Sequence, residues 1–336
     1  MVNRSFPHLD WTTGSLPVGV DAHTVDGLIS RLVHRPDNEG RTHGLVVISM
    51  GHIVREWYGE GLTHESTHIS WSMAKSIVHA LVGIAVKDGL LSLEQTHLLP
   101  QWDNDERAHI SVHDLLTMRS GLSWVEDYVD DSISDVIEML FGDSEHTGDH
   151  AAYAAAKSLK YSPGTHWEYS SGTTNILARI LANALGEESG AHVVMEKFMT
   201  TRLCDVIGMS ITPKFDAAGT FVGSSFAYAT ARDFAKFGYL YLNDGVWNGD
   251  RILPAGWVRD AATAVTIDQE TQMGYGTHWW TWPDDDGSMI AHGYEGQITW
   301  VSPDRDLVVV HVGKTPAESA DRLRRGLAQI VAEFPA

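Results

Sequence analysis

Strand-like segments stand at the two ends of this chain, and helical segments fill its middle. Near the start, residues 44–58 form two β-rich runs around Gly51, a pattern typical of a hairpin. Near the end, Gln297–Val301 and Leu307–Val312 are strand-like runs separated by a turn. We therefore predict that strands from both ends share one antiparallel sheet, with a helix within 316–334 packed on it.

Hydrophobic spacing predicts that the middle of the chain is mostly helical. The segments expected to be helical are 72–88, 112–118, 131–141, 174–185 and 191–203. The expected fold class is α/β (α+β), with an antiparallel sheet, flanking helices and an inserted, mostly helical domain. We expect residues 1–75 and 205–336 to form the α/β domain and residues 76–204 the helical one. The active-site cleft is expected between them.

Charge and composition limit the partners of the chain. Lysine and arginine number 24 against 44 aspartate and glutamate residues, a formal net charge of −20, which disfavours nucleic acid and anionic membranes. The single cysteine, Cys204, excludes an internal disulfide and any cysteine-based metal cluster. The first twenty residues lack the apolar core of a secretory signal, and no apolar run is long enough to span a bilayer. We expect a cytoplasmic protein.

The segment Ser72-Met73-Ala74-Lys75 is the first feature that could carry chemistry. Residues three apart share a helix face, so the Ser72 hydroxyl and the Lys75 amine can meet. The helix that follows is apolar nearly all round and is therefore expected to be buried, which lowers the pKa of a lysine. Such a lysine can take the proton of a serine nucleophile. The plainer alternative is a helix-capping serine beside a lysine that reaches to solvent.

Two further segments could complete a site. In Tyr169-Ser170-Ser171, the Tyr169 phenol could share a proton with Lys75, and Ser171 could bind substrate or orient the lysine. The alternative is a capping Ser/Thr cluster with one packed aromatic residue. The glycine-rich segment Ala291–Gln297 could offer a backbone N–H to an oxyanion, or be a turn with a solvent-facing histidine. Tryptophans flank these segments and are candidates for an apolar acyl pocket or for ordinary packing: Trp124, Trp167, Trp279 and Trp280.

In their order and spacing, these three motifs resemble those of the penicillin-recognising serine hydrolases. That family includes the class C β-lactamases, the DD-peptidases, and related esterases and 6-aminohexanoate-dimer hydrolases. Connecting segments at 113–122, 229–238 and 248–254 agree, and the likeness runs from about residue 40 to 330. The resemblance implies a β-lactamase/transpeptidase-like fold and catalysis without any metal or organic cofactor.

The resemblance also implies roles for individual residues. Ser72 would be the acylated nucleophile, Lys75 its proton partner, and Tyr169 the base or proton relay; which of the last two is the general base stays open. The backbone N–H groups of Ser72 and Tyr294 would form the oxyanion hole, and further expected substrate-binding residues are Ser171, His292 and Gly293.

Two departures from the family pattern affect the expected substrate. Ser171 stands where the second motif usually has asparagine. The third motif is usually Lys-Thr-Gly or His-x-Gly; with Gly293 as anchor, Ala291 replaces the lysine, whereas a shift by one residue puts His292 first. In either register the cation that grips a substrate carboxylate is weakened or lost. This favours an esterase or an amidase similar to the 6-aminohexanoate-dimer hydrolases over a β-lactamase or DD-peptidase.

Alternative functions are less well supported. His64-Glu65-Ser66-Thr67-His68 fits the zinc-hydrolase pattern H-E-x-x-H, but its context is poor for the helix that this motif requires. A non-catalytic binding protein would usually have lost Ser72, Lys75 or Tyr169, and all three are present. We expect a serine hydrolase, monomeric or homodimeric, whose partner is a small ester or amide substrate rather than nucleic acid or a membrane.

Overall fold

A computed structural model describes residues 6–7, 10–127, 134–142, 148–188, 190–285 and 287–336. Its largest feature is an eight-stranded antiparallel sheet, in which the strands lie side by side in the order β2-β1-β13-β12-β11-β10-β9-β8. The strands are β1 (Arg41–Ser49), β2 (His52–Tyr58), β8 (Thr266–Ile267), β9 (Gly274–Tyr275), β10 (Trp280–Thr281), β11 (Met289–Gly293), β12 (Gln297–Ser302) and β13 (Leu307–Lys314). Smaller sheets pair β3 (Thr67–Ile69) and β4 (Thr212–Pro213) with β5 (Ala227–Thr230), and β6 (Val246–Trp247) with β7 (Asp250–Arg251).

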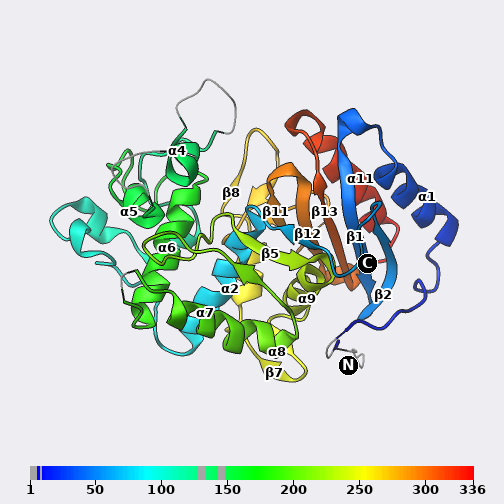
Figure 1. Cartoon of the computed structure of the whole chain (residues 1–336), viewed down its shortest axis with the longest axis horizontal. Helices are drawn as coiled ribbons and strands as arrows, with labels where there is room; N and C mark the ends of the chain where they lie inside the picture. The colour runs from blue at the N-terminus through cyan, green and yellow to red at the C-terminus, as the bar shows by residue number, and fades with distance from the viewer. Residues whose placement is uncertain (1–5, 8–9, 128–133, 143–147, 189, 286) are drawn as a thin grey trace.

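The sheet joins the two ends of the chain, as the sequence predicts. β1 and β2 form the expected hairpin, and β1 pairs along its whole length with β13, from Arg41 opposite Lys314 to Ser49 opposite Leu307. The strand pairs β11–β12 and β12–β13 are antiparallel hairpins. In Figure 1 the blue β1 lies beside the orange-red β13, so residues that are far apart in the sequence lie side by side.

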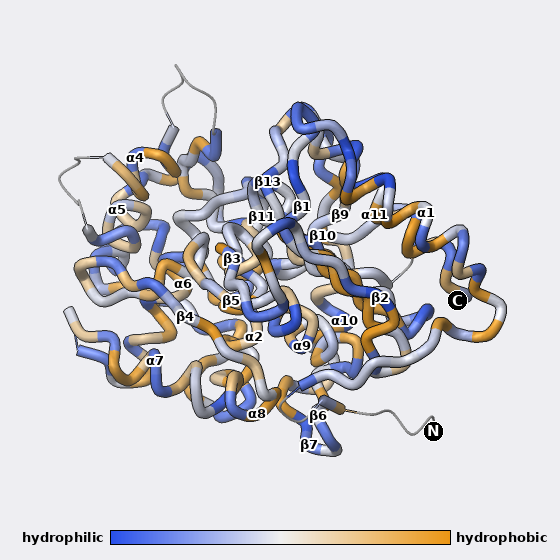
Figure 2. The backbone as a smooth tube through the Cα atoms, turned by 45° about the vertical axis from the view of Figure 1, so that its right-hand side comes forward, coloured by the Kyte–Doolittle hydropathy of each residue, from blue (hydrophilic) through white to orange (hydrophobic). Residues whose placement is uncertain are grey.

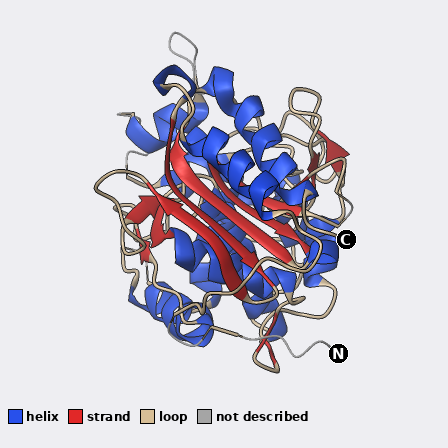
Figure 3. Cartoon of the chain, turned by 90° about the vertical axis from the view of Figure 1, so that its right-hand side faces the viewer, coloured by secondary structure: helices blue, strands red, loops and turns tan. Residues whose placement is uncertain are grey.

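Helices cover both faces of the sheet. On one face α1 (Ala22–Val33) and the C-terminal α11 (Ala320–Ala332) pack over an apolar cluster that includes Leu45, Val309 and Trp300. Figure 3 shows these two helices in front of the strands, and in Figure 2 the tube alternates between hydrophobic and hydrophilic colours along them. This alternation is expected of helices with one buried and one exposed face. The predicted C-terminal helix is therefore confirmed.

The other face of the sheet packs on α2 (Met73–Lys87) and α9 (Ala231–Leu242). Beyond them lie the helices of the middle of the chain, of which α4, α5, α6 and α7 are seen on the left of Figure 1. These are α3 (Val112–Leu116), α4 (Asp135–Phe141), α5 (His150–Ala155), α6 (Ser171–Ala184), α7 (Val193–Met199) and α8 (Asp205–Ile207), while α10 (Trp257–Ala262) follows α9. Among the described residues, no helix is long and apolar enough to cross a membrane.

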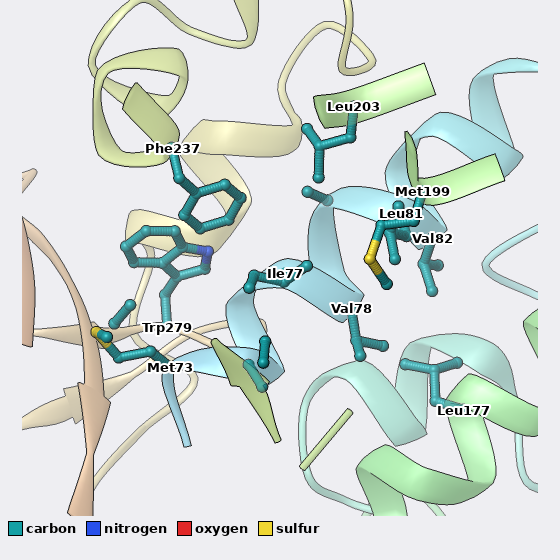
Figure 4. Packing of buried hydrophobic residues seen from close by; sticks show 14 of the residues in the cluster. Met73, Ile77, Val78, Leu81, Val82, Leu177, Met199, Leu203, Phe237 and Trp279 are labelled. Carbon is teal, nitrogen blue, oxygen red and sulfur yellow. The ribbon is translucent and has the colours of Figure 1, made fainter. Parts of the chain in front are cut away.

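The helix α2 runs through the centre of the larger apolar core. Its residues from Met73 to Ala85 are all buried, because neighbours from both the sheet side and the helical side surround it. Figure 4 shows Ile77, Val78 and Leu81 between Trp279 on one side and Leu177 on the other. An apolar surface on every side is what the sequence predicts for a fully buried helix.

Several predicted helix boundaries need correction. The helix expected from residue 174 begins at Ser171, because the Ser170 hydroxyl accepts a hydrogen bond from Thr173 N (3.0 Å) and so caps an earlier start. The helix expected over 112–118 ends at Leu116, and Met118 adopts a left-handed conformation (φ 57°). The helix expected over 131–141 begins at Asp135 in the described chain, with residues 131–133 outside the described residues.

Candidate active site

Ser72 lies at the N-terminal end of α2, three residues after the end of strand β3, at the edge of the core. Although Ser72 is the N-cap residue, its side chain makes no capping hydrogen bond, so the hydroxyl is available for other contacts. The preceding residue, Trp71, has a left-handed backbone (φ 43°) that turns the chain sharply into the helix. The aligned peptide dipoles of α2 favour negative charge at this end. Ser72 is thus half-buried at a place suited to a developing anion.

Lys75 lies one helical turn further along and does not reach solvent. Its side chain is only 2% exposed, and its Nζ donates hydrogen bonds to Ser72 Oγ (3.0 Å), Ser171 Oγ (2.9 Å) and the Ser224 carbonyl (3.0 Å). Burial lowers the pKa of Lys75 to about 8, partly offset by the negative charge of Glu126. The alternative of a lysine that reaches to solvent is therefore wrong, and near pH 8 a large fraction of Lys75 is the neutral amine.

Tyr169 completes the contacts around the Ser72 hydroxyl. Lys75 Nζ lies 4.8 Å from the centre of its ring, and the Ser72 side chain is close enough to the phenol to oppose part of the rise in its pKa. Burial, reinforced by the charge of Glu126, raises the pKa of the Tyr169 phenol above its ordinary value. The phenol therefore keeps its proton at neutral pH. Ser72, Lys75 and Tyr169, which lie in two separate sequence motifs, are brought together at one point.

Glu126 is a member of this site that the sequence analysis did not identify. One of its carboxylate oxygens accepts a hydrogen bond from Ser171 Oγ (2.6 Å), and the other accepts from Ser171 N (2.8 Å) and Trp124 Nε1 (2.6 Å). Ser171 is therefore held between the carboxylate and the Lys75 amine. No motif marks Glu126, because it lies in a loop 45 residues before its partner. Its one sequence signal is a carboxylate directly after the apolar pair Trp124-Val125.

The third motif reaches the site through its backbone. A Cβ added to Gly293 would lie 2.3 Å from the Ser70 carbonyl oxygen and 3.2 Å from Ser72 N, so strand β11 passes directly against the start of α2. A side chain at this position would force the two segments apart. The next residue, Tyr294, begins a short turn in which Glu295 is left-handed (φ 58°). Tyr294 thus directly follows the glycine that packs against Ser72 N.

The side chain of His292 lies on the opposite face of the sheet. Successive residues of a strand point to opposite faces; Ala291 belongs to the core around α2, whereas Ile298, paired with His292, belongs to the core under α1 and α11. Burial and the nearby Arg324 of α11 lower the pKa of His292 to about 3. The His292 side chain is thus directed away from the face on which Ala291 lies against the core around α2. This placement favours the register in which Ala291 replaces the family lysine.

The flanking tryptophans have different surroundings. Trp279 is fully buried and stacks on Phe237 (5.9 Å between ring centres), and Trp124 is buried while it binds Glu126. Trp280 and Trp167 are half-buried; Trp280 lies 5.4 Å from the Tyr169 ring, and Trp167 lies 6.2 Å from Trp280. Trp279 is therefore a core residue, whereas Trp280 lies beside Tyr169 and Trp167 packs against Trp280.

The rival zinc and thiol sites lack the required geometry. His64 is exposed in a turn, and His68 is buried on β3, so the two histidines do not share a helix face. Among the residues that the structure describes, no group of three histidine, cysteine or carboxylate side chains could hold a metal ion. Burial raises the pKa of Cys204 to about 12, far from the range of a reactive thiolate.

Gly293→Ala is expected to damage the reaction more than the fold. The added methyl group meets the Ser70 carbonyl oxygen and must push β11 away from Ser72. If the two backbones form an oxyanion hole, we expect kcat to fall by about 10²–10³-fold, comparable to the loss of one oxyanion donor. Steady-state kinetics on a short ester tests this, with Gly27→Ala on α1, where the added Cβ meets nothing closer than 3.9 Å, as control. An unimpaired Gly293→Ala enzyme would contradict the placement.

Comparison with known proteins agrees with this arrangement. The family model described as Beta-lactamase matches residues 26–333. A 6-aminohexanoate-dimer hydrolase from Paenarthrobacter ureafaciens is 26% identical over 312 residues, covering 87% of this chain and 78% of the relative. A solved structure of a suspected 6-aminohexanoate-dimer hydrolase from Bacillus anthracis has a TM-score of 0.78 at 21% identity, covering 100% of this chain and 91% of the other.

Another solved structure, EstCE1, described as a hydrolase with promiscuous acyltransferase activity, has a TM-score of 0.71 at 15% identity and covers 93% of this chain and 98% of its own. At these identities the solved structures establish the shared fold, which is the β-lactamase/transpeptidase-like fold expected from the motifs. The match to the family model spans nearly all of the chain, from α1 to the end of α11. The chain therefore belongs to the Beta-lactamase family.

Proposed function

We propose that the protein is a serine hydrolase that cleaves ester or amide bonds through an acyl-enzyme on Ser72. The observation that carries this proposal is the buried Lys75, whose amine lies 3.0 Å from the Ser72 hydroxyl and whose pKa is lowered to about 8. A lysine in this state can accept a proton near neutral pH. The Paenarthrobacter relative, named for the hydrolysis of an amide dimer, supports the choice of substrate class.

The proposed acylation begins with proton transfer from the Ser72 hydroxyl to the neutral Lys75 amine. Ser72 Oγ bonds to the carbonyl carbon, and the oxyanion that forms is stabilised by the backbone N–H groups of Ser72 and Tyr294. Tyr169, which keeps its proton, then donates it to the leaving alkoxide or amine as the bond to the carbonyl carbon breaks. The phenol regains a proton from Lys75, so atoms and charges balance. Water then releases the acid by the same steps in reverse order.

Within this proposal Lys75 is the general base and Tyr169 the proton relay. The opposite shifts of their pKa values support this division, because burial makes the amine easier and the phenol harder to deprotonate. Ser171 and Glu126 are positioning residues that hold the Lys75 amine toward Ser72. We propose further that the protein acts in the cytoplasm as a monomer or homodimer and that its site lies between residues 76–204 and the rest of the chain.

The dependence of activity on pH tests the role of Lys75. With a neutral p-nitrophenyl ester, kcat/KM is expected to rise with pH to a plateau, with a midpoint of about 8, because only the unprotonated amine accepts the Ser72 proton. Glu126 raises the pKa of Lys75, so Glu126→Gln is expected to move the midpoint to lower pH. A rate that is flat from pH 6 to 9, or a midpoint that moves upward in Glu126→Gln, would contradict this assignment.

A substrate panel tests the reaction class. We expect turnover of short p-nitrophenyl esters and of linear amides, and slow or no turnover of a chromogenic cephalosporin. Ala291 presents only a methyl group where the family's lysine grips the β-lactam carboxylate, and Lys314, at the end of the neighbouring β13, pairs instead with Glu295 (3.6 Å). Rapid cephalosporin hydrolysis would instead show a β-lactamase of this fold.

A further inference from the structure

Aromatic side chains gather in two groups beside Ser72. The first, which we call the Trp71 group, consists of Trp71, Tyr294, Phe226 and Phe141. Its ring centres are separated by 5.7 Å (Trp71 to Tyr294), 5.8 Å (Trp71 to Phe226) and 6.3 Å (Phe226 to Phe141). The second, the Tyr169 group, consists of Tyr169, Trp280, Tyr275 and Trp167, with neighbouring ring centres 4.8–6.2 Å apart. Within the described parts of the chain, no ring contact joins the two groups.

Three members of the Trp71 group are carried by the backbone segments that surround the nucleophile, while Phe141 is the last residue of α4. Trp71 directly precedes Ser72, and Tyr294 directly follows Gly293, the residue packed against Ser72 N. Phe226 follows Ser224 and Ser225, whose carbonyl groups accept hydrogen bonds from Lys75 (3.0 Å) and Ser70 (3.1 Å). These rings are therefore fixed to the same three segments that hold the reacting groups in place.

Trp71 is held in one orientation although it is not buried in the core. Its indole Nε1 donates a hydrogen bond to Glu295 Oε2 (3.4 Å), and its ring stands at 90° to that of Tyr294. Both Trp71 and Glu295 have left-handed backbones, with φ of 43° and 58°. Such conformations cost free energy in residues other than glycine and persist where the surroundings require them, commonly at functional sites. The side chains of these two residues, each next in sequence to a proposed oxyanion donor, are joined by this hydrogen bond.

The Trp71 group also keeps apolar surface in contact with solvent. Trp71 and Phe226 are half-buried, Tyr294 is 40% exposed and Phe141 is 61% exposed. Aromatic surface left open beside a nucleophile is suited to bind an apolar part of a substrate.

The positions of the proton donor and the oxyanion donors decide which part of the substrate lies on which side. The leaving group must accept a proton, so it lies toward Tyr169 and its group. The carbonyl oxygen lies between the backbone N–H groups of Ser72 and Tyr294. The acyl chain then extends from the carbonyl carbon away from Tyr169, toward the Trp71 group.

From this placement we infer that Trp71, Phe226 and Tyr294 form an acyl subsite that takes an uncharged, apolar acyl chain of several carbons. Phe141 extends this surface for longer chains, and the Glu295 carboxylate at its edge disfavours acyl chains that carry a negative charge. The inference rests on the proposed function, since it divides the substrate of the Ser72 reaction into acyl and leaving groups. The acyl pocket is thus formed around the residue just before the nucleophile, and not by the tryptophans that flank the motifs.

Acyl-chain selectivity tests the subsite. The measured quantity is the ratio of kcat/KM for p-nitrophenyl octanoate to that for p-nitrophenyl acetate. We expect the wild-type enzyme to favour the octanoate, and Trp71→Ala and Phe226→Ala each to lower the ratio at least about tenfold, because contact of even one methylene group with an apolar site is worth about 10–200-fold in discrimination. A general loss of activity affects both esters equally and cancels in the ratio. Two independent variants are used so that the test remains possible if one variant does not fold.

The matched control is Trp282→Ala. Trp282 is a half-buried tryptophan that packs on Trp300 (5.1 Å) under the opposite face of the sheet, so the ratio should keep its wild-type value. A second comparison, Trp280→Ala, should change the preference among alcohols in a series of acetate esters and leave the acyl ratio unchanged.

A failure of the proposed function can be distinguished from a failure of the acyl subsite. If ester hydrolysis survives in Ser72→Ala, the proposed function itself is wrong. If hydrolysis depends on Ser72 but both Trp71→Ala and Phe226→Ala keep the wild-type octanoate-to-acetate ratio in folded protein, the acyl subsite is wrong and the proposed function stands. A ratio that responds to Trp280→Ala instead would place the acyl chain on the Tyr169 side and overturn the assignment.

Discussion

Ser72→Ala is expected to abolish hydrolysis of short p-nitrophenyl esters, with a fall in kcat of about 10⁴-fold or more. The substitution removes the oxygen that bonds to the carbonyl carbon and leaves the rest of the site in place. Because the Ser72 hydroxyl makes no capping hydrogen bond, the helix α2 loses little stability. The variant should therefore fold and melt like the wild type, so a loss of activity would report on chemistry alone.

A covalent probe gives this result a second, independent measurement. A fluorophosphonate should add to one residue of the wild-type enzyme, located at Ser72 by peptide mass spectrometry, and should not label Ser72→Ala. Ser92→Ala, in an exposed loop where the hydroxyl donates a hydrogen bond to Glu94 (3.3 Å), is the control and should keep both labelling and turnover. Full activity in Ser72→Ala, or labelling at another serine, would refute the acyl-enzyme mechanism.

Lys75→Met is expected to lower kcat/KM by about 10²–10⁴-fold at every pH, because no other amine lies within hydrogen-bonding distance of Ser72 among the described residues. Methionine fills a similar volume in the apolar core. The variant should also lose the rise of activity around pH 8. Activity that still rises with a midpoint near 8 in Lys75→Met would show that another group titrates.

A separate prediction concerns how the free energy of unfolding of the wild type, compared with that of Lys75→Met, depends on pH. The pKa of Lys75 is about 8 in the folded protein and near 10.5 in an unfolded chain, so the unfolded state binds more protons between these values. The free energy of unfolding of the wild type should therefore rise relative to that of Lys75→Met between about pH 8 and 10.5, by about 3 kcal/mol in all. Chemical denaturation at pH 7 and pH 10 measures this difference. An unchanged difference would mean that Lys75 is not buried as described.

The parts of the site that could be predicted from the sequence depend on local geometry or on strong patterns. The contact between Ser72 and Lys75 follows from one helical turn, and the burial of Lys75 follows from an apolar helix surface. The pairing of the first and last strands follows from matching β-rich runs at both ends of the chain. In each case the pattern that determines the outcome lies within one or two short segments.

The parts that could not be predicted depend on strand register, on the path of a loop and on the backbone conformation of single residues. Which face of the sheet receives His292 is fixed by the pairing of β11 with β12, and a change of one residue would exchange His292 and Ala291. Glu126 reaches Ser171 from an irregular loop whose path no periodic pattern describes. Trp71 has its orientation because of a left-handed backbone that sequence patterns do not assign to tryptophan.

The pairing of β1 with β13 has a consequence for how the protein is made. The sheet that places β11 against the nucleophile is complete only when residues 307–314 have paired with residues 41–49. During synthesis the nucleophile helix leaves the ribosome more than two hundred residues before the strand that completes this sheet. Contacts between such distant segments slow folding, because a long loop must close before they form. Hydrolytic activity should therefore appear only after nearly the whole chain has been released, and partly synthesised chains should have none.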